Sequence, residues 1–108
     1  MLTSAFMECS GLEIVDAINL TLYSGAFQDC ASLVSLVLRG DSASTLNSTD
    51  AFTRTPIASG TGYIYVPRAL LATYQAATNW STFAAQFRAL EDYTVDGTTT
   101  GALDPTKI

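Results

Sequence analysis

Hydrophobic residues recur along the chain at a fixed interval that is longer than the period of any helix or strand. The segment 5–12 (AFMECSGL) resembles the segment 26–33 (AFQDCASL), with an offset of 21 residues between the matched Ala, Phe, Cys and Leu positions. A third Ala-Phe pair lies at 51–52, after a polar stretch at 39–50 that is rich in Ser, Thr, Asn and Asp. We interpret that stretch as a loop inserted before a third, degenerate repeat.

Each repeat contains one short stretch of alternating apolar residues, which predicts a strand with one face turned inward. Successive strands are expected to pair in parallel, with the rings of Phe6, Phe27 and Phe52 stacked beside them. The 21-residue period falls within the range of about 20–29 residues that is typical of leucine-rich repeats. The expected inward pairs are Val15 and Ala17, Leu36 and Leu38, and Ile64 and Val66.

From Pro67 onward, the apolar residues take the spacing of helices. Those at 70, 74 and 77 predict a helix over about 67–77, and those at 83, 87 and 90 predict a second helix over about 80–91. We expect the aromatic side chains of these helices, including Trp80, to cover the open end of the strand stack, because terminal repeats need a cap. Core packing therefore explains these aromatic residues better than a platform for stacking sugars.

A small hairpin is expected after the cap, with strands at 93–95 and 98–100 joined by a turn at Asp96 and Gly97. The predicted fold class is α+β: a short right-handed leucine-rich-repeat solenoid with parallel strands in about three coils, a two-helix C-terminal cap and a small C-terminal hairpin. The chain is expected to form a single domain over 1–108. It divides into repeats at 1–66, a helical cap at 67–91, and hairpin and tail at 92–108.

The composition fits one globular domain and narrows the class of partner. Of the 108 residues, 48% are hydrophobic and 14% are charged. The net charge of −5 argues against nucleic acid or an anionic membrane as a partner, since both attract basic surfaces. No apolar run reaches the roughly 18 residues of a membrane span, so no membrane insertion is expected. No signal-peptide pattern is visible at the start of the sequence.

The sequence offers little candidate chemistry. It contains no histidine, which removes Ser-His-Asp and Cys-His catalysis and His-ligated zinc. Asp92, Asp96 and Gly97 faintly resemble a calcium loop, but Leu103 stands where that loop requires a bidentate carboxylate. No phosphate loop or nucleophile elbow occurs. We therefore expect a protein that is not an enzyme, with no catalytic, metal-binding or cofactor-binding residues and no cofactor.

Cys9 and Cys30 occupy equivalent positions in successive repeats. Neighbouring strands lie about 4.8 Å apart, which falls inside the range of about 4.4–6.8 Å between the Cα atoms of a disulfide. Geometry therefore permits a bridge. Both side chains are nevertheless expected to point inward, where cysteine commonly serves as a small core residue, and this favours reduced, structural thiols.

The repeat Ala-Phe-x-x-Cys-x-x-Leu at 5–12 and 26–33 resembles the repeat of the BspA-like leucine-rich repeat family of bacterial surface proteins. The C-terminal pattern of that family is similar to the run from TPI at 55–57 through GTG at 60–62 and IYVP at 64–67 to Tyr74 and Trp80. The resemblance covers about residues 5–90. It implies a secreted or cell-surface protein, often one that adheres to host or neighbouring proteins.

Two functions remain open. In the first, the chain is a non-catalytic protein-interaction or adhesion module. In the second, it is a purely structural segment that closes the C-terminal end of a longer protein or assembly and has no ligand of its own. An exposed tyrosine-bearing strand face would favour the first, and a face covered by the 39–50 loop or the hairpin would favour the second. The expected protein-contact residues on that face are Ile14, Asp16, Ile18, Ser35, Val37, Arg39, Tyr63 and Tyr65.

The sequence begins almost inside the first repeat, which leaves little length for a cap on that side. We therefore expect the first coil to present an apolar end that is covered in one of two ways. A second copy of the chain would give a homodimer, and further repeats upstream would extend the stack. The apolar residues expected at this end are Met1, Leu2, Phe6, Leu12 and Val15.

Overall fold

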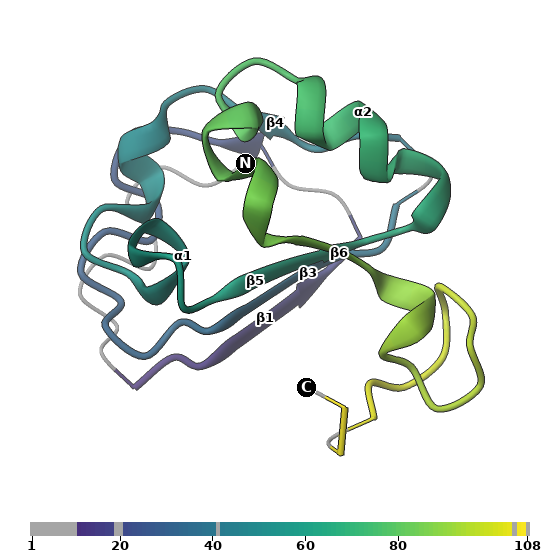
Figure 1. Cartoon of the computed structure of the whole chain (residues 1–108). Coiled ribbons are helices and arrows are strands. Elements are labelled where there is room, and N and C mark those ends of the chain that lie inside the picture. The colour runs from purple at the N-terminus through teal and green to yellow at the C-terminus, as the bar shows by residue number, and fades with distance from the viewer. Residues whose placement is uncertain (1–10, 19–20, 41, 105, 108) are drawn as a thin grey trace.

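The computed structural model describes residues 11–18, 21–40, 42–104 and 106–107, and it is a mixed α/β structure built on parallel strands (Figure 1). Four strands form the main sheet in the order β1-β3-β5-β6, and two more pair in parallel as a second, smaller sheet, β2-β4. The strands are β1 (Ile14–Ala17), β2 (Thr21–Leu22), β3 (Ser35–Leu38), β4 (Thr45–Leu46), β5 (Tyr63–Val66) and β6 (Phe87–Ala89).

The register of the main sheet confirms the predicted parallel pairing of the repeated strands. Val15 of β1 pairs with Leu36 of β3, and Leu36 pairs in turn with Ile64 of β5. The inward side chains of β3 and β5 are fully buried, and Val15 packs against them from the edge of the sheet. Equivalent residues of successive chain segments therefore lie side by side.

The short helices, except the last one, lie along one side of the sheet (Figure 1). The helix α1 (Pro56–Ser59) begins at Thr55, whose hydroxyl accepts a hydrogen bond from the N–H of Ala58 at 3.2 Å. It ends at Gly60, which adopts a left-handed conformation with φ of 93°. The other helical segments are α2 (Leu71–Ala76) and four 3-10 helices: η1 (Thr49–Phe52), η2 (Arg68–Leu70), η3 (Trp80–Gln86) and η4 (Leu90–Asp92).

The prediction of a helix over 80–91 is wrong in its second half. The chain forms the 3-10 helix η3, in two turns that meet at Phe83, and then enters the sheet as β6. Phe87 and Ala89 of β6 are buried, whereas Arg88 between them turns outward over Tyr63. This stretch therefore fits a strand period as well as a helix period, and pairing with β5 selects the strand. The helix expected over 67–77 is present as η2 followed by α2.

Stacked aromatic rings form the centre of the core. Phe27 stacks on Phe52 with ring centroids 5.9 Å apart and an interplanar angle of 11°. This confirms the predicted stacking of these two rings, whereas Phe6 lies outside the described residues. Phe52 also contacts the edge of Phe83 at 5.3 Å and the tilted indole of Trp80 at 6.1 Å. The same ring thus joins the strand segments to the cap.

The C-terminal hairpin is present, but its return strand lies later in the chain than expected. Thr94 pairs with Leu103 in an antiparallel bridge, and the N–H of Val95 donates to the carbonyl of Ala102 at 2.9 Å. The predicted return at 98–100 forms part of a loop instead, because a carboxylate oxygen of Asp96 accepts hydrogen bonds from the N–H and hydroxyl of Thr98. These local bonds compete with strand pairing at that position.

Within the part of the chain that the structure describes, no helix has the length and apolar character needed to span a bilayer.

We expect Phe52→Ala to lower the free energy of unfolding by about 3–5 kcal/mol, because the change leaves a cavity among three aromatic rings. Urea denaturation followed by the fluorescence of Trp80 measures the loss. Val95→Ala is the control, since that side chain is 66% exposed and its truncation is expected to cost no more than about 0.5 kcal/mol. Equal effects of the two changes would contradict a central role for Phe52.

Candidate functional site

The outer face of the main sheet, which the sequence predicts as the contact surface, carries its side chains in two adjacent rows. Asp16, Val37 and Tyr65 are in register in one row, and Ile14, Ser35 and Tyr63 are in register in the other. The predicted alignment of these residues on one face is therefore confirmed, but their exposure differs from the prediction.

Three of the predicted contact residues are buried: Ser35 is 1% exposed, Val37 is 0% exposed and Tyr65 is 3% exposed. Val37 and Tyr65 form a second hydrophobic cluster with Leu90, and Tyr93 and Leu103 pack against it. The prediction of an open face at these positions is wrong, because side chains of residues 90–104 pack over this part of the sheet. We call residues 90–104 the strap, and it lies on the opposite side of the sheet from α1 and α2 (Figure 1).

Aromatic contact and burial both act on Tyr65 beneath the strap. The ring of Tyr93 lies 4.8 Å from the ring of Tyr65, at an angle of 58°. Burial raises the pKa of the Tyr65 hydroxyl above its usual value of 10.0, and a hydrogen bond with Ser35 opposes part of this rise. Tyr65 is thus a buried residue of β5 that packs beneath the strap, and it is not exposed to a partner.

Arg39 holds the strap in place. Its guanidinium binds both carboxylate oxygens of Asp16 at 2.6 and 2.9 Å, and its Nη1 donates to the carbonyl oxygens of Thr99 and Gly101 at 3.0 and 2.7 Å. The hydrogen bond with Asp16 raises the pKa of Arg39. The side chain is only 15% exposed and its donors are engaged within the chain, so Arg39 offers a partner little surface. Its role as a contact residue stays a prediction.

Gly101 has the small size that the strap loop needs at this point. A Cβ atom on Gly101 would lie 1.9 Å from a carboxylate oxygen of Asp96, closer than any real contact. The same carboxylate accepts hydrogen bonds from Thr98, which lower the pKa of Asp96. The loop that Arg39 binds is therefore ordered by its own side chains.

The remaining predicted contact residues stay at the surface. Ile14 is 46% exposed, Ile18 is 70% exposed and Tyr63 is 36% exposed, and the Asp16 carboxylate is 40% exposed beside Arg39. The guanidinium of Arg88 lies 4.5 Å above the ring of Tyr63, at a distance typical of a cation–π contact. Where β1 and β3 end, a pocket of about 350 Å³ is lined by Ile18, Arg39, Gly40, Thr99 and Thr100.

Most Lys and Arg side chains of the chain form ion pairs with its own aspartate side chains. Of the five Lys and Arg residues, four pair with carboxylates: Arg39 with Asp16, Arg54 with Asp29, Arg68 with Asp92, and Lys107 with Asp104. The hydrogen bond from Arg54 lowers the pKa of Asp29. Among the residues that the structure describes, the excess negative charge is therefore carried by carboxylates outside these four ion pairs.

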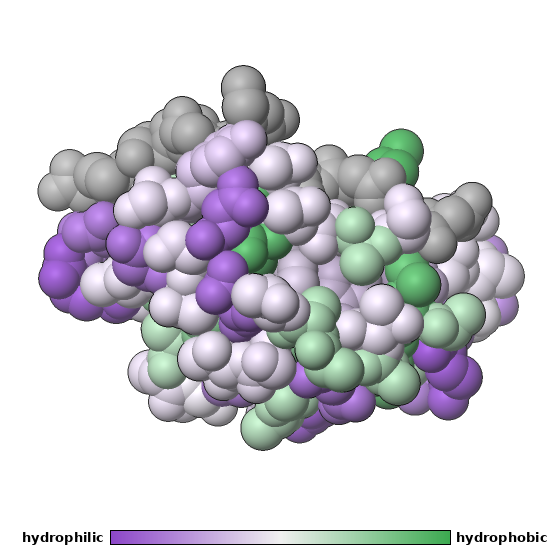
Figure 2. Space-filling model, turned by 90° about the horizontal axis from the view of Figure 1, so that it is seen from above, coloured by the Kyte–Doolittle hydropathy of each residue, from purple (hydrophilic) through white to green (hydrophobic). Residues whose placement is uncertain are grey.

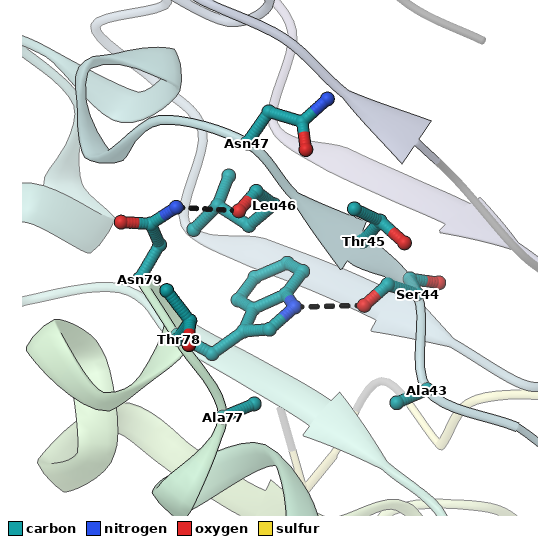
Figure 3. A pocket seen from close by; sticks show the side chains of 9 residues that line it. Ala43, Ser44, Thr45, Leu46, Asn47, Ala77, Thr78 and Asn79 are labelled. Atoms are coloured by element: carbon teal, nitrogen blue, oxygen red, sulfur yellow. Dashed lines mark hydrogen bonds between the residues drawn. The ribbon is translucent and has the colours of Figure 1, made fainter.

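The opposite side of the molecule is closed by side chains of the cap. The Tyr74 hydroxyl accepts from the N–H of Ser44 at 2.6 Å, and the indole Nε1 of Trp80 donates to the Ser44 carbonyl at 2.8 Å. The amide of Asn79 donates to the carbonyl of Leu46 at 2.7 Å (Figure 3). These side chains form hydrogen bonds with the backbone groups at the edge of β4, where a further strand would otherwise pair.

A pocket of about 350 Å³ lies between β4 and the turn at 77–80 (Figure 3). Its lining has no charged side chain, and the indole that it borders is 1% exposed. Trp80 and Tyr74 are thus core residues, as the sequence predicts, and provide no platform for a sugar. Seen from above, the surface mixes purple, white and pale green residues, and strongly hydrophobic residues show at only a few places (Figure 2). The pocket is lined by Ala43, Ser44, Thr45, Leu46, Asn47, Ala77, Thr78, Asn79 and Trp80.

The residues placed by the structure hold no cluster of three or more His, Cys, Asp or Glu side chains that would suit a metal ion. Cys30 is fully buried in the core, as the sequence predicts. Cys9, Met1, Leu2 and Phe6, on which the predicted thiol pair and the predicted apolar end also depend, lie outside the described residues.

No family model matches the chain, and comparison with curated proteins and with solved structures finds no match either.

We expect Arg39→Lys to loosen the strap, because lysine retains the charge but not the planar set of donors that binds Asp16 and two carbonyls at once. Hydrogen exchange at the amides of Val95 and Asp104 should become faster. Arg54→Lys is the matched control, since it alters an Arg–Asp pair away from the strap. Unchanged exchange in the Arg39 variant would contradict the clamping role.

Burial of the Tyr65 hydroxyl predicts a loss of stability at alkaline pH. The folded state holds the neutral form, so the free energy of unfolding should fall as the pH rises from 10.0 toward the higher pKa of the folded state. Tyr65→Phe should reduce this alkaline slope, which urea denaturation at several pH values measures. A slope that is identical in both proteins would show that Tyr65 is not protected in this way.

Proposed function

We propose that the chain is a non-catalytic protein-interaction module, built as a short leucine-rich-repeat solenoid that is closed on its cap side and open to a partner on its β1 side. The observation that carries this proposal is the difference between the two ends of the sheets. The polar edge of β4 is satisfied by three side chains of the cap, whereas β1 stands at the edge of the main sheet.

Several features support the solenoid architecture. Strands from successive repeats pair in parallel and in register. The rings of Phe27 and Phe52 stack on each other in the core. The second parallel sheet, β2-β4, follows the same order along the chain. Closure of one end by an aromatic layer is what a repeat stack needs, because its last hydrophobic layer would otherwise meet water.

The strap changes where the partner is expected to bind. It covers Val37 and Tyr65, so the outer strand face offers a partner much less surface than the sequence suggests. This covering favours the alternative in which the chain is a purely structural closing segment. The exposed side chains of Ile14 and Ile18 on the β1 side favour a contact there instead.

The resemblance to BspA-like leucine-rich repeat proteins supports a bacterial surface or secreted location and a role in adhesion. The high proportion of internally paired cations supports a protein partner over nucleic acid, because four of the five positive groups are already engaged with carboxylates. A second copy of the chain on the β1 side would give a homodimer.

Site-specific photo-cross-linking in the cells that make the chain tests this function. A benzophenone-bearing residue in place of Ile14 on β1 should give covalent protein adducts. The same residue in place of Thr73, which is exposed on α2, should give none. Adducts at Thr73 alone would place the contact on the cap side and contradict the proposal. Adducts at neither position would favour the purely structural alternative.

A further inference from the structure

The hydrogen-bonding groups of β1 divide into those that face β3 and those that face the outer edge. The carbonyl of Glu13 accepts from the N–H of Ser35 at 3.2 Å, and the carbonyl of Ala17 accepts from the N–H of Arg39 at 2.8 Å. Bonding residues alternate along a parallel strand. The N–H and carbonyl groups of Ile14 and Asp16 therefore point away from β3, and no strand among the described residues pairs with them.

The side chains at this edge define the chemistry of a partner. Ile14 is 46% exposed and provides apolar surface. The exposed carboxylate of Glu13 has no basic partner among the residues that the structure places, and the carboxylate of Asp16 remains 40% exposed beside Arg39. A second copy of the chain would bring a net charge of −5 against the same charge, which opposes association. A basic segment would be attracted instead.

We propose that the outer edge of β1 binds an extended segment of another protein by strand addition, and that this segment alternates apolar with lysine or arginine residues. The backbone of the added strand pairs with Ile14 and Asp16. Its apolar residues lie on the outer face of the sheet, where they cover Ile14, and its basic residues lie on the opposite face, where strand alternation places the Glu13 side chain. This inference rests on the proposed interaction at the β1 side and names the class of partner.

The proline substitution Ile14→Pro isolates the edge from the rest of the sheet. It removes an N–H that faces outward and leaves the bonds from β1 to β3 in place, and proline is tolerated on edge strands for this reason. Ile14→Ala is the matched control, because it shortens the same side chain but keeps the N–H. Thermal melting of both variants checks that the fold is retained.

The probe is a seven-residue peptide of alternating lysine and valine, whose binding to the full chain is followed by the fluorescence anisotropy of a label on the peptide. Ile14→Pro should weaken binding by about tenfold or more, the equivalent of one to two hydrogen bonds, and Ile14→Ala should weaken it less. Higher salt should weaken binding further. A peptide with glutamate in place of lysine should not bind.

A second measurement does not depend on how the proline variant folds. The lysine–valine peptide with an N-methyl group on every backbone amide has no N–H to donate to a strand edge, so it should bind the unaltered chain about tenfold more weakly. Equal binding of the two peptides, or of the lysine and glutamate peptides, would overturn the inference. A dimer of the free chain that Ile14→Pro dissociates would identify a second copy as the occupant and also overturn it. Cross-linking at Ile14 tests the proposed interaction module separately. The strand-addition proposal can therefore fail in the peptide assay while the proposed function holds, and the reverse.

Discussion

The in-register parallel pairing of the main sheet is the constraint on which the other features depend. Because Val15, Leu36 and Ile64 lie side by side, each strand turns the same face to the core and the same face outward. The inward row meets Phe27 and Phe52, and the outward row meets the strap. A slip of one residue would bring Val37 and Tyr65 into the aromatic core and leave Leu36 and Ile64 outside it. The packing of the core, the contact with the strap and the outward groups of the β1 edge therefore all depend on this one strand register.

The fold was largely predictable wherever one repeat resembles the next. The offset between Phe27 and its earlier counterpart predicted which residues of β1 and β3 would pair, and the buried cap aromatics followed from the need to cover the stack. The strand β6 was not predictable from its own sequence, because Phe83, Phe87 and Leu90 match the helix period. Pairing with β5 selects the strand over the helix, and a local sequence pattern does not reveal that contact.

The candidate site was predicted less well than the fold, for a physical reason. Alternation along the strands correctly placed Asp16, Val37 and Tyr65 in one outward row, but it does not reveal what lies over that row. The covering residues Leu90, Tyr93 and Leu103 come from a segment distant in sequence. Their apolar character was the one signal in the sequence that this segment packs against another surface, because a fully exposed hairpin rarely contains a residue such as Leu103. The role of Arg39 depends on two backbone carbonyls, which no sequence pattern identifies.

The position of Arg39 also links the two ends of the described fold. One guanidinium holds a carboxylate on the first strand and two carbonyls of the last loop, so the energies of those contacts are not independent. A change that draws Asp16 away from Arg39 therefore removes part of what fixes the strap. Through this single side chain, the exposed surface at β1 is joined directly to the segment that covers Tyr65.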